Sequence, residues 1–242
     1  MSETLVLPKK KVAPVHQNPR TLLIYSKPKA GKSSALAGLE NNLILDLEKG
    51  SDFIEALKVS ISSIQQLQQV GEQIKREGKP YKYITIDTVT ALEELAKGLA
   101  LANYKATPMG KNFTGKSVLD LPQGSGWYHL RVAFFSLIDY VKTLSDNVIL
   151  SGHIKDKVIN DTGTTVEAAN VDLSGKIKSM ICAQSDTIGY LYRKSNETFI
   201  SFKATDEVTC GTRSPHLRDA VIKIAEMGED GVLTTYWDKI YK

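Results

Sequence analysis

The sequence predicts an α/β protein with a mostly parallel sheet and helices on both faces. Short apolar runs alternate along the chain with amphipathic stretches of helical length, which is the pattern of a parallel sheet whose strands are connected by helices. Several of these runs end in a polar or acidic residue. Because ligands of open α/β sheets bind at the carboxyl ends of the strands, we expect the functional residues to gather at that edge.

The first strand is expected at residues 22–25, and the sequence after it has the features of a phosphate-binding loop. The apolar run breaks at Ser26-Lys27-Pro28, and a helix is expected to begin at Lys32-Ser33-Ser34. Strand, loop, Gly-Lys-Ser and helix is the order found in P-loops. In such loops the backbone N–H groups surround a phosphate, the lysine reaches the β- and γ-phosphates, and the serine hydroxyl ligates Mg²⁺.

We therefore expect ATP and Mg²⁺ to bind at this loop. Gly31 allows the backbone to approach the phosphates closely, and Lys32 is expected to face solvent in the empty site. Glycine usually occupies the first position of the pattern, and Ser26 can replace it if its φ is not strongly positive. An ordinary lysine-bearing turn before a helix is the alternative interpretation. The nucleotide-binding residues expected are Ser26, Lys27, Pro28, Lys29, Ala30, Gly31, Lys32, Ser33 and Ser34.

The other elements follow from apolar periodicity and turn residues. Further strands are expected at 42–48, 83–88 and 147–153, and helices at 62–77, 89–103 and 127–144. Residues 104–126 form a long polar loop, and 154–173 are loop-like, with a hairpin turn at Asp161-Thr162-Gly163. A helix at 174–184, strands near 186–193 and 197–204, a last helix at 215–227 and a short tail at 232–241 complete the prediction.

Composition indicates one domain at residues 20–242, preceded by an extended basic tail at 1–19. The tail contains three prolines and the run Lys9-Lys10-Lys11, and it is either a solubilising end or a basic arm that reaches a neighbouring subunit. Neither a membrane span nor a signal peptide is recognisable, so we expect a cytoplasmic protein with no membrane partner. The two cysteines are expected to be reduced and buried. A net charge of +4 permits nucleic-acid binding without requiring it.

Two carboxylates and a histidine follow the predicted strands. Asp87 ends an apolar run in the manner of a Walker B aspartate, which holds the Mg²⁺ shell together with Ser33. Glu48 is suited to orienting or deprotonating the attacking water. His153 is placed to sense the γ-phosphate at the end of the fourth strand. The alternatives are a helix-capping Asp87, a solvated Glu48 and a histidine that is satisfied locally.

The ordered set of these motifs resembles the ATPase core of the RecA family, over roughly residues 20–214. The resemblance is carried by Asp46-Leu47-Glu48, by residues 84–88 and by residues 148–155. It is strongest with small, core-only RecA-like ATPases of bacteriophages, which are linked to recombination and single-strand annealing. The resemblance implies a three-layer RecA-like P-loop fold, with Glu48 as the hydrolytic base. It also implies that His153, where RecA itself has Gln, couples the nucleotide to DNA.

In that family two loops line the DNA path, and they correspond here to 104–126 and 154–176. Lysines and aromatic rings in and near these loops are suited to phosphates and to base stacking, without a pattern that reads sequence. Two solvated loops are the alternative. Arg213 corresponds to a cation that acts on the ATP of the next subunit, or else it is a surface arginine. The DNA-binding residues expected are Lys105, Lys111, Phe113, Lys116, Lys155, Lys157, Lys176 and Lys178.

Together these observations predict an oligomeric, Mg²⁺-dependent ATPase, stimulated by single-stranded DNA, that acts in phage-type recombination or strand annealing in the host cytoplasm. Its partners would be single-stranded DNA, further copies of the chain in a ring or filament, and a single-strand-binding protein. A nucleotide-gated binding module that serves a partner protein with little or no hydrolysis is the alternative. A kinase of small molecules would need a lid with clustered arginines, and none is recognisable.

Overall fold

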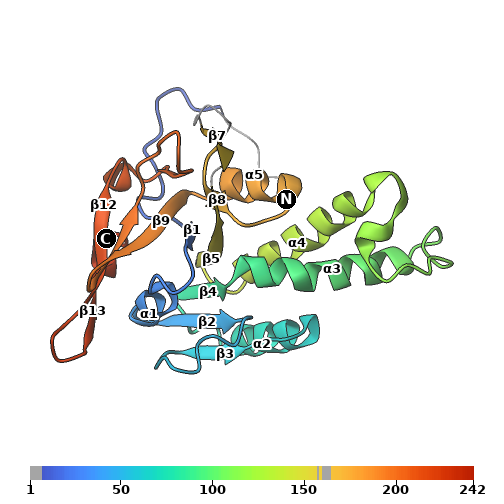
Figure 1. Ribbon diagram of the computed structural model, residues 1–242, viewed down its shortest axis with the longest axis horizontal. Helices are drawn as coiled ribbons and strands as arrows, with labels where there is room; N and C mark the ends of the chain where they lie inside the picture. Colours follow the sequence, from blue (N-terminus) through green and yellow to red (C-terminus); the bar gives the residue numbers. More distant parts are fainter. Residues whose placement is uncertain (1–6, 157, 160–164) are drawn as a thin grey trace.

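A computed structural model describes residues 7–156, 158–159 and 165–242 (Figure 1). Within these residues the main sheet has the strand order β13-β12-β10-β9-β1-β5-β4-β2-β3, with β11 paired to β9 and β8 paired to β5. Its strands are β1 (Thr21–Ser26), β2 (Asn42–Asp46), β3 (Lys58–Ser60), β4 (Tyr83–Asp87), β5 (Asn147–Lys155), β8 (Asn170–Val171), β9 (Thr187–Lys194), β10 (Glu197–Ser201), β11 (Gly211–Thr212), β12 (Val221–Met227) and β13 (Leu233–Thr235).

The six strands from β9 to β3 pair in parallel, and the strands from β10 to β13 extend the sheet in antiparallel pairs. This confirms the predicted α/β class with a mostly parallel sheet. β1, β2 and β4 are buried along their whole length, which explains why they appear in the sequence as continuous apolar runs and not as alternating ones. Their carboxyl ends lie at one edge of the sheet.

Helices cover the two faces of the sheet unequally. The helices are α1 (Lys32–Ala37), α2 (Ile64–Arg76), α3 (Val89–Lys105), α4 (Gly126–Lys142) and α5 (Gly175–Gln184). Side chains of α2, α3, α4 and α5 pack in one core against one face of the sheet. The other face is covered by α1 and by the 3-10 turns η3 (Pro215–Leu217) and η4 (Trp237–Lys239). The layer on this second face is therefore thinner than the sequence indicates.

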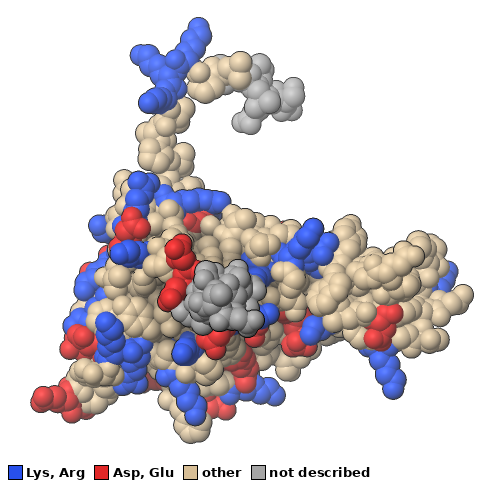
Figure 2. Space-filling view, turned by 45° about the horizontal axis from the view of Figure 1, so that its top comes forward, with Lys and Arg blue, Asp and Glu red and all other residues tan. Residues whose placement is uncertain are grey.

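The α3–α4 pair projects from the sheet as an arm (Figure 1). Two short 3-10 turns, η1 (Val118–Asp120) and η2 (Pro122–Gly124), lie in the connection between the helices. On the face seen in Figure 2 the outer part of this arm is largely uncharged. Its exposed apolar side chains are Met109, Trp127, Tyr128 and Val132. The predicted loop at 104–126 is thus a structured connection at the outer end of two helices.

The predicted helix at 215–227 is wrong. The chain makes the turn η3 and then the strand β12, which pairs with β10. Ile222 and Ile224 pack in the core of the second face and Lys223 lies on the opposite face, so the periodicity is that of a strand. The short strands β3 and β13 were also not expected, because three-residue edge strands leave little pattern in a sequence.

Several smaller expectations concern segments beside the sheet. β6 (Val158–Ile159) and β7 (Thr165–Glu167) form an antiparallel pair, while the predicted turn at Asp161-Thr162-Gly163 lies outside the described residues. Residues 7–17 of the tail are exposed and contain no helix or strand. Cys182 and Cys210 are free thiols, as expected, although Cys182 is only half-buried. Among the helices of the described chain, none combines the length and the apolarity needed to cross a bilayer.

Candidate nucleotide-binding site

Register in the sheet brings the predicted functional residues to one edge. β1 and β5 pair so that Ser26 lies beside His153, and β4 and β5 pair so that Asp87 lies beside Ser151. β2 adds Asp46 next to Asp87. Because all these strands run parallel, their polar ends meet around the loop that follows β1.

The loop after β1 has the backbone of a phosphate-binding turn. Lys29 and Gly31 have φ values of 61° and 89°, and Gly31 immediately precedes α1. Ser26 is the last residue of β1, where it is buried, and it is not among the residues with positive φ. Serine is therefore accommodated at the first position of the motif without the left-handed conformation that would require glycine.

A cavity of about 510 Å³ lies over this loop. The strands and loops around it contribute residues of different chemistry: loop backbone, hydroxyls, carboxylates and cations. Its lining residues are Ser26, Lys27, Pro28, Lys29, Gly31, Lys32, Ser33, Ser34, Glu48, Gly50, Ile54, Asp87, His153 and Arg193. All the predicted nucleotide-binding residues except Ala30 thus line one cavity, together with the predicted Asp87, Glu48 and His153.

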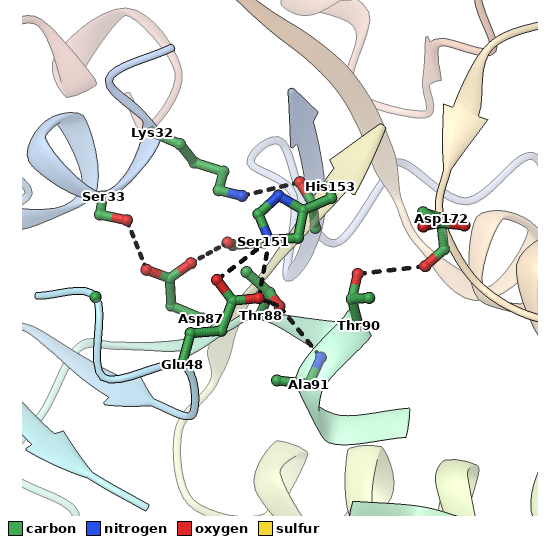
Figure 3. Close-up of polar contacts among 12 residues, drawn as sticks. Lys32, Ser33, Glu48, Asp87, Thr88, Thr90, Ala91, Ser151, His153 and Asp172 are labelled. Atoms are coloured by element: carbon green, nitrogen blue, oxygen red, sulfur yellow. Dashed lines mark hydrogen bonds and ion pairs between the residues drawn. The ribbon is translucent and has the colours of Figure 1, made fainter. Parts of the chain in front are cut away.

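Lys32 is buried, with 7% of its surface exposed, so the expectation that it faces solvent is wrong. Its Nζ donates a hydrogen bond of 2.9 Å to the carbonyl oxygen of Gly152 in β5 (Figure 3). Burial lowers the pKa of Lys32, and the nearby carboxylates of Asp87 and Glu48 oppose this effect. The lysine therefore has a protein partner that a phosphate would have to replace.

Ser33 and Asp87 form the part of the site that suits a divalent cation. The Ser33 hydroxyl donates to Asp87 Oδ2 at 2.7 Å, and Ser151 donates to Asp87 Oδ1. A hydroxyl and a carboxylate are hard oxygen ligands that fit Mg²⁺. The described residues contain no cluster of three or more His, Cys, Asp or Glu side chains that could hold a metal. Ser33 and Asp87 would therefore be the residues that hold Mg²⁺.

Glu48 is held in place by two neighbours. Thr88 donates to Glu48 Oε1 at 2.5 Å, and His153 Nε2 lies 2.9 and 3.1 Å from the two carboxylate oxygens (Figure 3). Thr88 also accepts a hydrogen bond from the N–H of Ala91 and so caps α3. With two acceptor oxygens opposite it, Nε2 is the protonated nitrogen of the ring, while Nδ1 is buried without a hydrogen-bond partner.

His153 is not the end of its strand, which corrects the sequence interpretation. β5 continues to Lys155 and pairs there with β8. The backbone oxygen of His153 accepts from the N–H of Asp172, whose own carbonyl accepts from the Thr90 hydroxyl at 3.2 Å. His153 thus contacts Glu48 through its side chain and the segment before α5 through its backbone.

The predicted DNA-binding residues lie in two separate regions. Figure 1 places the connection between α3 and α4 at the outer end of the arm, away from β7 and α5. Lys105, Lys111 and Lys116 are exposed in the first region, where Phe113 is partly buried against Tyr104. In the second region Lys155 and Lys176 are exposed and Lys178 is half-buried, whereas Lys157 lies outside the described residues.

Arg213 lies at the opposite edge of the sheet from the cavity. It pairs with Asp186 at 3.1 Å and donates to the carbonyl of Ala183 at 2.8 Å. Asp186 also accepts from the N–H of Thr21, the first residue of β1. Within its own chain Arg213 is therefore remote from the Ser33–Asp87 pair.

Sequence reasoning did not find Ser151, Thr88 or Arg193 as members of the site. Thr88 carried a signal, because it occupies the cap position immediately before a predicted helix. Ser151 depends on the register of β5 against β4, and Arg193 depends on the pairing of β9 with β1. Neither pairing can be read from a single sequence.

Comparison with known proteins assigns the chain to a family. Residues 18–214 match the family described as AAA domain, which is most of the chain, and the chain therefore belongs to that family. The family and the fold are those of P-loop ATPases in general. No protein among the curated sequences matches the chain.

Two solved structures overlap the chain at 12% sequence identity. The RadB recombinase gives a TM-score of 0.44, with 90% of this chain and 92% of the other covered. A KaiC-like protein of Pyrococcus horikoshii OT3 gives 0.46, with 90% and 89% covered. At these TM-scores neither likeness bears on function.

Proposed function

We propose that this protein hydrolyses ATP with Mg²⁺ and uses the nucleotide to control binding of single-stranded DNA. One observation carries the proposal: Lys32, Ser33, Asp87 and Glu48 line one cavity although three different strands position them. When bound, Mg²⁺ would neutralise charge on the phosphates beside Ser33 and Asp87. Lys32 gives up its hydrogen bond to the Gly152 carbonyl and binds the β- and γ-phosphates instead. The Glu48 carboxylate accepts the proton of the attacking water.

Hydrolysis requires Glu48 to leave its present partners. Both of its oxygens lie within 3.1 Å of His153 Nε2, so a water at the γ-phosphate competes with the histidine for the carboxylate. Release of Glu48 leaves the His153 side chain free to turn. The carbonyl oxygen of His153 accepts a hydrogen bond from the N–H of Asp172, which lies four residues before Lys176. These contacts support coupling between the nucleotide and the lysines of the second region.

ATP turnover measured with and without single-stranded DNA tests the proposal. We expect turnover that DNA stimulates, and Glu48→Gln should reduce it by about 10²-fold or more while ATP still binds. Normal hydrolysis by Glu48→Gln would place the base elsewhere. DNA that binds without changing turnover would contradict the coupling.

DNA binding has its own test. Replacing Lys155 and Lys176 by alanine should weaken binding and lower the slope of log affinity against log salt by about 1.4, which corresponds to two lost phosphate contacts. Lys79 and Lys82, which precede β4 at the other edge of the sheet, give the matched control pair. An equal effect of both pairs would show that only net charge matters.

A nucleotide-gated binding module is the second candidate, and the hydrogen bonds of Glu48 favour it. Thr88 and His153 together occupy the carboxylate, which would keep hydrolysis slow unless a partner releases it. In that case ATP would change affinity for the partner without DNA-stimulated turnover. The turnover measurement above separates the two candidates.

The proposed biological role is recombination or strand annealing by a homo-oligomer, with a single-strand-binding protein as a further partner. If the chain is phage-encoded, it acts in the cytoplasm of the bacterial host. In the assembled form Arg213 would leave Asp186 and contact the γ-phosphate of the neighbouring subunit. Annealing of complementary strands with and without ATP, together with mass measurement of the complex, tests this role.

A further inference from the structure

We propose that Arg193 binds the α-phosphate of the nucleotide from within the same chain. The inference rests on the proposed function and adds a side-chain cation to the backbone contacts that the P-loop offers. Arg193 lines the cavity above the P-loop, and it comes from β9, which lies outside every motif of the sequence.

The hairpin of β9 and β10 packs directly on the P-loop. Arg193 pairs with Thr198 across the hairpin, and a Cβ built on Gly31 would lie only 3.3 Å from Thr198 Oγ1. The strands that carry Arg193 therefore form a wall of the nucleotide cavity and not a distant surface.

One hydrogen bond orients the side chain of Arg193, and its terminal nitrogens are available to a ligand. Its Nε donates to the carbonyl of Ser195 at 2.8 Å, and Ser195 has a φ of 51° in the turn of the hairpin. Among the described residues no carboxylate pairs with the Arg193 guanidinium, which is exposed to solvent. A cation held by one hydrogen bond with its terminal nitrogens available is suited to an anionic oxygen.

The position of β9 in the sheet indicates which phosphate it reaches. β9 and β5 lie on opposite sides of β1, and the strand of Asp87 lies beyond β5. Three inter-strand steps of about 4.8 Å separate β9 from β4, roughly 14 Å in all. With Ser33, Asp87 and Glu48 around the γ-phosphate, Arg193 faces the other end of the triphosphate. A guanidinium there matches the α-phosphate, the anionic group nearest the ribose.

Calorimetric titration with ATP, ADP and inorganic pyrophosphate tests the inference. Arg193→Ala should lower the affinities for ATP and for ADP by the same factor, about tenfold or more. Both ligands carry the α-phosphate, and the variant loses a charge-assisted hydrogen bond to it. Pyrophosphate, which fits the cradle of Lys32 and Ser33, should bind as in the wild type. Arg193→Gln keeps an N–H donor for the Ser195 carbonyl but carries no charge. It should therefore show the same loss of affinity for ATP and ADP.

Lys194→Ala is the matched control, because it removes the same charge from the next residue, whose side chain lies over the Tyr192 ring. Wild-type affinities in both Arg193 variants would overturn the inference, and so would a loss confined to ATP or shared by pyrophosphate. If Lys32→Ala abolishes nucleotide binding while the Arg193 variants do not change it, only this inference fails. A wild-type protein that binds neither nucleotide would overturn the proposed function as well.

Discussion

Replacement of Lys32 by methionine separates what this lysine does for the fold from what it does for the ligand. Lys32 is buried, and its described hydrogen bond is the one from Nζ to the Gly152 carbonyl at 2.9 Å. Methionine has a similar length without the charge, so the variant keeps most of the packing. We expect a folded protein that no longer gains stability from nucleotide.

The magnitudes follow from two opposing effects on the unliganded protein. The variant loses a hydrogen bond from a charged donor, about 1.5–3 kcal/mol, and it removes a desolvation penalty of comparable size. We therefore expect the free energy of unfolding without ligand to change by no more than about 1.5 kcal/mol. Nucleotide at 100 times its Kd stabilises the wild type by about 2.7 kcal/mol, and this increment should vanish in Lys32→Met.

The pH dependence gives an independent check. Burial lowers the pKa of Lys32 in the folded protein below its unfolded value of 10.5. As pH rises through the lowered pKa towards 10.5, the unfolded chain binds more protons than the folded one, so wild-type stability increases relative to Lys32→Met. Any advantage of the methionine variant at neutral pH should therefore shrink in alkali.

Thermal unfolding followed by circular dichroism, with and without Mg-ADP, measures both effects. The wild type should gain about 5–10 °C from the nucleotide, since 1 kcal/mol corresponds to about 2–4 °C at this size. Lys82→Met, an exposed lysine, controls for the change of residue type. A full nucleotide-induced shift in Lys32→Met would refute the phosphate assignment, and a collapse of the unliganded protein would refute the energetic reasoning.

Three further predictions concern other parts of the site. Asp87→Asn should weaken ATP binding in Mg²⁺ but not in its absence, as titrations at several Mg²⁺ concentrations will show. Asp46 is buried and accepts from the N–H groups of Glu48 and Ser51; burial raises its pKa, but the hydrogen bonds from Ser51 and the loop outweigh this and lower it. Asp46→Asn should therefore reduce the free energy of unfolding at neutral pH by about 1–3 kcal/mol, and the difference should diminish below about pH 4, where the wild type loses this contribution by protonation. Mixing Arg213→Ala subunits with Glu48→Gln subunits should restore part of the turnover if Arg213 acts on a neighbour, whereas co-assembly without recovery would leave it a structural partner of Asp186.

The sequence was most informative where the residues that indicate a feature are contiguous in the chain. The P-loop could be placed because the strand, the Gly-Lys-Ser and the helix are contiguous, and Asp87 because it ends a buried run. The helix predicted at 215–227 failed because Ile222 and Ile224 pack as alternate residues of an antiparallel edge extension. That extension depends on a partner strand far away in sequence, which local periodicity does not specify.

The environment of the site was harder to predict than its members. The register of β1 and β5 places Gly152 beside Tyr25, so that the Gly152 carbonyl can accept a hydrogen bond from the buried Lys32. Only the folded sheet defines this register. Arg193 enters the cavity because β9 adjoins β1 on the side away from β5. Residue types suggested the chemistry, whereas long-range strand pairing decided which groups touch.

The short strands at the two ends of the sheet restrict how copies of this chain can associate. β3 and β13, the outermost strands, have three residues each. Edges of this length present few unpaired N–H and C=O groups, so they are poor templates for continuing the sheet into another molecule. Continuation of the sheet at β3 or β13 is therefore not expected to be the way in which a homo-oligomer assembles. Variants that lengthen either edge would be expected to aggregate by strand addition before they strengthen a specific assembly.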